Sequence, residues 1–475
     1  MSDYVPPYPH RWTEELSPWK RVRLARRNVL AAFEDGLFEV DHISRRILLK
    51  HLFLCNSPQT VQDAFGTKYA SFERKSPTMR HMLEPLIGDG LFISEGETWR
   101  RRRRIVAPVI HVSRLSEFAP AMIDTACEMA DRWGELPEGA PVDVLSQMAQ
   151  LTAEIICRAI FGRQLGAGRT REVVDGFSEF SRVVSSIDLP SLLGLPDWVP
   201  RFRHFAVARS VRRIHRVIDE IIAGYRDRPD SANTSVVGRL IDARDEETGE
   251  KLSANALRNE AVVIFMAGHE TTANTLSFVW FLLSQAPDVE ARLHAELDAV
   301  LGDRPPSLAD VANLVYTRAI VEETLRLYPP IPILAREATR DETIAGAKVP
   351  KGSMVMVIPW LLHRHRKLWK KPDHFWPERF LPENGPAPSK WAYLPFSNGP
   401  RVCAGMAFGM TESILSVAIL AQQFRLRLAA GHTVEPVCRV SLRPGETLPM
   451  TIHRRRAAPS AAATEALAAC PFGHG

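Results

Sequence analysis

Cys403 is the residue of this sequence whose surroundings most clearly indicate chemistry. It ends an irregular segment rich in glycine and proline, FSNGPRVC at 396–403, and an apolar helical pattern follows from Ala404 onward. A cysteine at that position meets the free N–H groups and the positive dipole end of the helix, which favours thiolate over thiol. Because a thiolate is a metal ligand, the position predicts a metal site.

The residues around Cys403 indicate which metal group it would hold. Gly399 and Gly405 leave the backbone bare, so that it can lie against something flat and large. Phe396 is placed to shield the sulfur from water, and Arg401 supplies a cation for an anionic group. Together these residues predict a haem with Cys403 as axial ligand. The alternative is a small cysteine buried beside a helix start. It does not explain why five positions of FxxGxRxCxG are met, a match with a probability on the order of 10⁻⁴ in random sequence of this length.

A second segment, at 268–272, contains polar residues in the middle of a long predicted apolar helix. The helical pattern begins at an N-cap, Ser253, and runs to about Gln285, where Pro287 stops it. At about 1.5 Å per residue this helix would be about 50 Å long, and apolar residues on nearly every face of its middle indicate burial. The segment GHETT interrupts that middle, and its glutamate is costly to bury unless it is satisfied. One interpretation is a kink in which a hydroxyl bonds to a carbonyl one turn earlier, and the other is a functional site.

These two segments and two further motifs resemble those of the cytochrome P450 family of haem-thiolate monooxygenases. The resemblance extends from about Trp12 to Arg455. The segment AGHETT at 267–272 resembles the family's oxygen-groove motif, ETLR at 323–326 its ExxR helix, and PERF at 377–380 its PERF segment. All of them occur in the family's order along the chain.

The resemblance implies a set of residues that hold haem b, with the Cys403 thiolate as the axial ligand of the iron. The propionates would be bound through a WxxxR helix, a strand after ExxR and the cysteine segment. The cofactor-binding residues would be Trp99, Arg103, Ala267, Arg336, Phe396, Arg401, Cys403 and Gly405.

The resemblance also implies a catalytic pair, Glu270 and Thr271. Thr271 would hydrogen-bond the bound oxygen, while Glu270 relays protons from solvent. The helix would loosen at Gly268 and so open the groove that holds dioxygen.

Glu323 and Arg326 lie on one face of their helix, and on their own they indicate a surface ion pair. The resemblance implies instead that they form a charge network with Arg379, which locks a loop beneath the haem. Such a network is structural rather than catalytic. Losing one partner would leave a buried charge unpaired.

The function implied is a monooxygenase that inserts one atom of dioxygen into a C–H or C=C bond of a lipophilic molecule. The segments expected to line the pocket are mostly apolar, and the residues assigned to it are Ile264, Ile333, Leu334 and Leu448. The sequence holds no GxGxxG after a strand and no four-cysteine cluster. A separate ferredoxin or flavodoxin, with its NAD(P)H-dependent reductase, is therefore expected to supply the electrons.

Three other functions remain open at this point. The chain could be a haem-thiolate peroxygenase or isomerase, or a haem sensor without chemistry, although neither needs the Glu270-Thr271 pair. A third possibility places haem or metal at Cys470 in the tail, but this segment lacks the rigid surroundings that such a site needs.

Five consecutive arginines at 100–104 have two interpretations. They form a solvated helix face, or, since Arg103 would point to the haem, their neighbours emerge where an acidic ferredoxin docks by electrostatic steering. No aromatic residues interleave them, so nucleic acid is not expected as a partner. His363, in LLHRHRKLW, is expected to be a packed or surface residue and not an axial ligand.

The elements that would position these residues are mainly helical. Up to about Val300 the pattern is of successive helices, and helix returns from Gly405 to Phe424. Two β-hairpins are expected, around the turns at 350–352 and 443–446. This predicts a mainly α fold with small β-sheets (α+β), in which haem is buried between the long central helix and the cysteine segment. Residues 1–455 would form one cytochrome P450 domain, and 456–475 a low-complexity, mobile tail.

The composition of the 475 residues is that of an ordinary globular chain, 45% hydrophobic and 24% charged. It excludes disordered, collagen-like and disulfide-scaffold proteins, and a net charge of +5 is too small to indicate wholesale nucleic-acid binding. The six cysteines stand apart without a CxxC pair. The N-terminus lacks a secretory pattern, and no apolar run approaches the roughly 20 residues that span a bilayer. We therefore expect a cytoplasmic protein without a transmembrane anchor.

Overall fold

The computed structural model describes residues 3–47, 50–162, 205–226, 235–438 and 441–455, together with Glu172, Gly176, Phe177 and Phe180. The expected tail at 456–475, with Cys470, lies outside the described residues. The helices are α1 Pro18–Arg27, α2 Pro58–Gln62, α3 Pro77–Ile87, α4 Gly96–Val106, α5 Leu115–Gly134, α6 Val144–Phe161, α9 Phe205–Arg226, α10 Val236–Asp242, α11 Ala254–Gln285, α12 Pro287–Leu301, α13 Val315–Leu327, α14 Pro359–Leu362 and α15 Met406–Gln423. The strands are β1 His42–Ile47, β2 Lys50–Cys55, β3 Arg74–Lys75, β4 Ala140–Asp143, β5 Leu334–Glu337, β6 Glu342–Ile344, β7 Ala347–Val349, β8 Met354–Val357, β9 Phe424–Leu428, β10 Val437–Cys438, β11 Leu442–Arg443 and β12 Pro449–Arg454.

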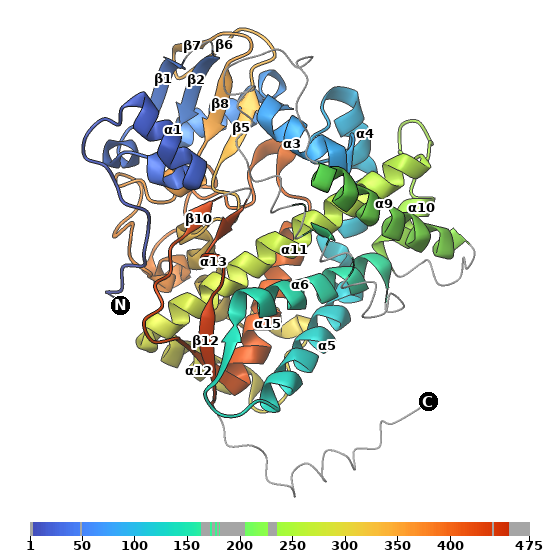
Figure 1. Cartoon of the computed structure of the whole chain (residues 1–475), viewed down its shortest axis with the longest axis vertical. Helices are drawn as coiled ribbons and strands as arrows, with labels where there is room; N and C mark the ends of the chain where they lie inside the picture. The colour runs from blue at the N-terminus through green and yellow to red at the C-terminus, as the bar shows by residue number, and fades with distance from the viewer. Residues whose placement is uncertain are drawn as a thin grey trace, which may run out of the picture.

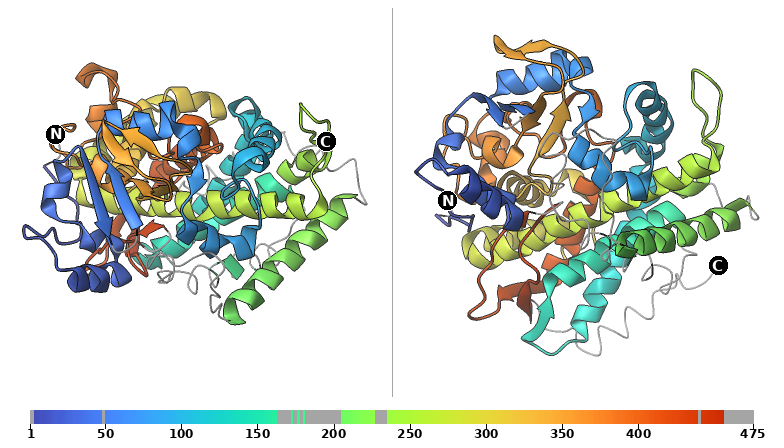
Figure 2. Two further views of the ribbon diagram at one scale, coloured as in Figure 1. Left: turned by 90° about the horizontal axis from the view of Figure 1, so that it is seen from above. Right: turned by 45° about the horizontal axis from the view of Figure 1, so that its top comes forward.

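Helices make up most of the fold, and small sheets lie beside them, as the predicted fold class requires (Figure 1). The long central helix is confirmed as α11, which crosses the molecule in every view (Figure 2). Its N-cap is Ser253, whose hydroxyl accepts the Ala256 N–H at 3.2 Å, and Pro287 begins the next helix. Buried residues on all its faces make α11 the axis around which the other helices pack.

α6 packs closely along the middle of α11. The Thr152 hydroxyl donates to the His269 carbonyl at 3.0 Å. A Cβ on Gly268 would lie 2.8 Å from the Ile156 side chain, so the missing side chain lets the two helices approach. α11 remains α-helical through this segment, so the loosening expected at Gly268 is not what the structure shows. Gly268 serves helix packing.

The largest sheet of the described residues has the strand order β1-β2-β8-β5-β3. β2 and β8 run parallel, and the other neighbours run antiparallel. β1 and β2 contradict the expectation of successive helices up to about Val300. β1 pairs with β2, but the other neighbour of β2 is β8, about three hundred residues further along, since Leu52 is opposite Met354. A sequence pattern does not show such long-range pairing.

Both expected hairpins are wrong in their pairing, although strands flank both turns. The turn at 350–352 connects β7 to β8, which belong to different sheets, and the hairpin instead joins β6 to β7. It turns at Ala345 and Gly346, both with positive φ, as a tight two-residue turn requires. The turn at 443–446 likewise follows β11, which pairs with β10, whereas β12 pairs with β4 and β9.

The cysteine segment packs against the N-terminal part of the fold. Gly399 has φ +70°, and a Cβ there would lie 1.9 Å from the carbonyl oxygen of Phe65, in the short turn Asp63–Thr67. Glycine is therefore required twice over, by the left-handed backbone and by the close approach. The predicted helix after this segment is α15, Met406–Gln423.

We expect Gly399→Ala to cost about 1–3 kcal/mol more in free energy of unfolding than Gly302→Ala. Both glycines have positive φ, so both variants bear the left-handed backbone cost of about 1–2 kcal/mol, but a Cβ on Gly302 meets nothing within 4 Å. Urea unfolding of the full chain measures the difference. Equal losses would contradict the role given to the Phe65 contact.

Candidate functional site

Cys403 lies between a short turn, Gly399–Arg401, and the start of α15, and its backbone N–H donates to the Phe396 carbonyl at 2.9 Å. Its side chain reaches solvent, yet protein atoms surround it densely on the other sides. Burial raises the pKa of the Cys403 thiol, and the Gly405 N–H and the charges of Arg103 and Lys75 only partly offset this. The helix start alone therefore does not hold a thiolate. Coordination to a metal ion would supply what is missing.

A cluster of cations surrounds Cys403: Lys75, Arg103, Arg336 and Arg401. The register of β3 and β5 places Lys75 opposite Arg336. The Arg401 guanidinium lies 4.5 Å from the ring centre of Trp99, and one of its N–H groups donates to the Ser94 carbonyl at 2.6 Å. Lys75 was not identified from the sequence, and its pattern carries no signal for this position.

Within the described residues, no carboxylate lies at ion-pair distance from any of the four cations. Burial, followed by the charge of Arg401, lowers the pKa of Arg336 to about 9. Burial also lowers the pKa of Arg401 to about 10 and that of Lys75 well below its usual value, where Arg336 and Arg401 add repulsion. Arg336 is buried and the other three cations are partly buried, and among the described residues only Arg401 has nearby carboxylates, Glu73 and Glu95, that partly offset its charge. Such a cluster is costly, so it calls for an anionic group. The two propionates of a haem fit it.

The middle of α11 is open on one side. Ala267 is exposed, and Gly268, Glu270 and Thr271 are partly exposed, between long buried stretches. The Thr271 hydroxyl donates to the Ala267 carbonyl at 2.6 Å, which is the bond one turn earlier that the plain-kink interpretation expected. The polar residues are thus partly satisfied within the helix while remaining accessible.

Glu270 is held by β11, a strand that sequence reasoning did not connect with it. Its Oε1 accepts from the Ser441 hydroxyl at 2.6 Å and from Arg443 Nε at 3.0 Å, with Arg443 Nη2 also in contact. The Asn274 amide in turn donates to Ser441 at 3.1 Å. Burial raises the pKa of Glu270, but the charge of Arg443 and these hydrogen bonds outweigh it, so the pKa lies below its usual value.

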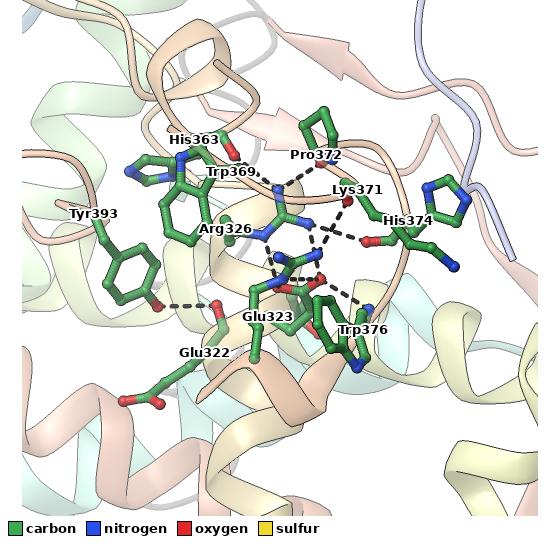
Figure 3. A network of polar contacts seen from close by, with 12 residues as sticks. Glu322, Glu323, Arg326, His363, Trp369, Lys371, Pro372, His374, Trp376 and Tyr393 are labelled. Carbon is green, nitrogen blue, oxygen red and sulfur yellow. Dashed lines mark hydrogen bonds and ion pairs between the residues drawn. The ribbon is translucent and has the colours of Figure 1, made fainter. Parts of the chain in front are cut away.

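The structure brings Glu323, Arg326 and Arg379 together inside the protein (Figure 3). Arg326 donates to both carboxylate oxygens of Glu323, at 2.7 and 2.8 Å, and Arg379 Nε lies 3.0 Å from Glu323 Oε2. Glu323 and Arg326 have no exposed side-chain surface, so they are not a surface pair. The remaining donors of Arg326 bind the carbonyls of His363, Pro372 and His374.

His363 completes the link from this network to the cysteine segment. Its Nε2 accepts the backbone N–H of Leu394 at 3.0 Å. Burial, and then the charge of Arg326, lowers the pKa of His363 to about 3, so the ring is neutral and buried. It has the packing role expected of it.

The residues assigned to the substrate pocket divide between the two apolar cores. Ile264 is buried on α11, and Ile333 packs against the main core. Leu334 packs instead with the smaller core that includes Phe53 and Val357, so it faces another part of the fold. Leu448 is fully buried in the same core as Ile264, and its carbonyl accepts the Val144 N–H at the start of α6, so the pocket assignment stays a prediction.

The arginine run at 100–104 is mostly matched by carboxylates of the same chain. Arg102 pairs with Asp89 at 2.9 Å and Arg104 with Asp245 at 2.7 Å. Arg100 pairs with Glu97 and Glu73, and Arg101 with Glu250. Most of the charge of this run is therefore matched within the chain, although Arg100 and Arg101 remain partly exposed, and docking of an acidic ferredoxin at these positions stays a prediction. Arg103, the member without a carboxylate partner in the described residues, lies beside Cys403.

Glu412 is a buried carboxyl that sequence reasoning missed. It is fully buried on α15, and neither carboxyl oxygen makes a hydrogen bond of ordinary geometry within the described residues. Burial raises its pKa well above the usual value, although nearby Thr272 lowers it somewhat, so Glu412 is neutral. The signal was available, because a lone glutamate interrupts the apolar α15 sequence as Glu270 interrupts α11.

Comparisons with known proteins agree with this geometry. The family model described as Cytochrome P450 matches residues 42–447. The chain is 33% identical to cyclooctatin synthase of Streptomyces melanosporofaciens, covering 85% of this chain and 87% of that protein. It is 32% identical to cyclooctat-9-en-7-ol 5-monooxygenase of the same organism, over 74% and 75%, and 29% identical to pentalenene oxygenase of Streptomyces avermitilis, over 74% and 77%. The crystal structure of the cytochrome P450DA heme domain superposes with a TM-score of 0.80 at 24% identity, covering 94% of this chain and 98% of that one.

We expect Glu323→Gln to lower the free energy of unfolding by about 3–5 kcal/mol, because it leaves Arg326 and Arg379 buried without their counter-charge. Glu412→Gln is the matched control, since an amide replaces a neutral carboxyl of the same shape and should change stability by less than about 1 kcal/mol. Urea unfolding of the two variants measures both. Similar losses would show that burial of the side chain, rather than its charge, decides the outcome.

Proposed function

The chain belongs to the cytochrome P450 family and is a monooxygenase, and we propose that it oxidises a lipophilic, cyclic substrate of the terpenoid class. We further propose that its cofactor is haem b with Cys403 as the axial ligand. Electrons would come from NAD(P)H through separate redox proteins. The reaction would be hydroxylation or epoxidation.

The observation that carries the cofactor assignment is a set of cations beside Cys403 that, within the described residues, have no carboxylate at ion-pair distance. Arg336 and Lys75 from adjacent strands, Arg103 from α4 and Arg401 from the cysteine segment offer positive charge to two propionates. Trp99, buried beneath Arg401, supports that side. Thiolate-ligated haem supplies the chemistry that activates dioxygen.

Thr271 and Glu270 of α11 would orient and transfer protons at this site. Thr271 keeps its hydroxyl on the helix through Ala267, which fixes its direction while leaving the oxygen able to accept a further hydrogen bond. Glu270 is a carboxylate held by Arg443 and Ser441, and it would have to part from Arg443 to carry a proton inward. Its relay would therefore require release of the Arg443 side chain.

The proposed substrate class is supported by the names of the relatives and by the apolar character of α11. The names of these relatives include cyclooctat-9-en-7-ol and pentalenene, and Ile264 on α11 belongs to the apolar core. No cation in the described residues is placed on α11 near Ile264 to bind a substrate carboxylate. Cyclic hydrocarbons and their alcohols fit such surroundings better than fatty acids.

Ferredoxin or flavodoxin, with an NAD(P)H-dependent reductase, is proposed as the electron source because these 475 residues include no four-cysteine cluster and no GxGxxG after a strand. No helix among the described residues has both the length and the apolar character needed to cross a membrane. We propose a cytoplasmic location.

In Thr271→Ala, NAD(P)H consumption should continue while product falls at least about tenfold and hydrogen peroxide rises, because the hydroxyl that directs protons is lost. The ratio of product to NAD(P)H consumed measures this. Thr275→Ala is the control, since its hydroxyl also bonds back one turn, to the Thr271 carbonyl at 2.9 Å, but Thr275 is buried. Unchanged coupling in Thr271→Ala would remove the role assigned to it.

A ferric absorbance titration of the haem-loaded protein tests the substrate class. Cyclic terpene alkenes and alcohols should produce a saturable low-to-high-spin shift, and fatty acids of equal carbon number should bind at least about tenfold more weakly. Product analysis with ferredoxin and its reductase then identifies the oxidised position. Tighter binding of the fatty acids would overturn the substrate assignment while leaving the monooxygenase assignment intact.

A further inference from the structure

α1 is the most strongly basic short helix that the structure describes. Its ten residues, PWKRVRLARR, include five cations and no carboxylate. Ser17 caps its N-terminus, and Arg26 and Arg27 lie in its last turn, where the helix dipole favours positive charge. α1 lies at the outer edge of the fold, beside β1 and β2, in all the views (Figures 1 and 2).

Two of the five cations have partners in the rest of the protein. Lys20 lies over the ring of Trp12, with 3.6 Å between Nζ and the ring centre, and Arg21 pairs with Glu34 at 2.6 Å. Arg23, Arg26 and Arg27 are exposed, and within the described residues none has a carboxylate at ion-pair distance. Their charge is directed to solvent.

Trp19 shares the face of these three arginines. Positions 19, 23, 26 and 27 are spaced i, i+4, i+7 and i+8, which places them on one side of a helix. The indole is 86% exposed, the highest exposure among the large hydrophobic residues described. Val22, Leu24 and Ala25 are partly buried and turn toward the protein. We call the outward side, formed by Trp19, Arg23, Arg26 and Arg27, the α1 face.

We propose that the α1 face docks reversibly on the anionic headgroups of a lipid bilayer. An indole is an amphipathic group that settles at the level of the headgroups, and arginine can lay its stem along apolar chains while its guanidinium binds phosphate. Each basic residue near an anionic surface adds attraction that salt weakens.

A bilayer fits the α1 face better than an acidic protein does. A stable protein interface buries about 800 Å² on each partner and centres on several packed anchors. The α1 face is one convex helix of ten residues with a single aromatic anchor. A fluid surface of phosphates needs no matching shape, so this small face is sufficient. Docking would also bring the protein to the phase in which the proposed lipophilic substrate dissolves.

The test is sedimentation of the full-length, haem-loaded protein with vesicles of phosphatidylcholine containing roughly 30% phosphatidylglycerol, and with vesicles of pure phosphatidylcholine. Binding should require the anionic lipid and fall between about 0.1 M and 0.5 M salt. Arg26→Gln/Arg27→Gln should lower the partition coefficient by at least about tenfold, since each charge contributes about fivefold. Brominated lipid should quench tryptophan fluorescence in the unchanged protein, and Trp19→Ser should remove that quenching.

Arg132→Gln/Arg425→Gln is the matched control, because it removes two exposed charges on α5 and β9, at the other end of the molecule from α1 (Figure 1). It should bind as the unchanged protein does. The reduced carbon monoxide spectrum verifies that every variant keeps its fold. The proposal is overturned if anionic vesicles do not bind the protein, or if the α1 variants bind as well as the control. A third outcome also overturns it, in which Arg26→Gln/Arg27→Gln abolishes vesicle binding while Trp19→Ser keeps both vesicle binding and the quenching of tryptophan fluorescence by brominated lipid. The α1 face would then recognise negative charge alone, as an acidic protein also offers it.

Discussion

The buried guanidinium of Arg326 imposes the strictest constraint on this fold. A fully buried charge must have its counter-charge and all its hydrogen bonds, and Arg326 obtains them from Glu323 and from three backbone carbonyls between His363 and His374. The irregular chain after α14 therefore has to wrap around α13. His363, within that chain, then holds Leu394 a few residues before the cysteine segment. The Glu323–Arg326 ion pair is thus linked, through His363, to the chain that leads into the cysteine segment.

Neighbouring arginines of α4 differ in whether a carboxylate neutralises them. Arg102 and Arg104 are neutralised by Asp89 and Asp245, so they attach α4 to the segments around it. Arg103, between them, has no carboxylate partner in the described residues and belongs with Lys75, Arg336 and Arg401. An isolated cluster of buried cations would destabilise the fold, and an anionic cofactor removes that cost. Folding and cofactor binding are therefore linked through the same residues.

α11 combines structural and chemical roles along one helix. Gly268 admits α6, and about one turn further along the helix the Thr271 hydroxyl remains accessible. Glu270 is linked to β11 by Arg443, and Thr272 approaches Gly409 and Glu412 of α15. Two carboxyl groups thus flank the centre of the helix, one ionised by a neighbouring arginine and one kept neutral by burial. Their opposite states follow from their partners, because the two side chains are chemically identical.

The sequence by itself determined the features that depend on neighbouring residues. The extent of α11 follows from its apolar pattern, the Ser253 cap and Pro287, and the cysteine segment with its helix is a contiguous motif. The tertiary structure alone decided which distant groups meet. Glu270 and Arg443 are 173 residues apart in the chain, Lys75 reaches the site only through the pairing of β3 with β5, and the strands beside both expected turns pair elsewhere. A local sequence pattern indicates backbone preference and burial, because both depend on neighbouring residues. Strand pairing and ion pairing join distant residues, so they depend on the energy of the whole packed fold and cannot be deduced from a short segment.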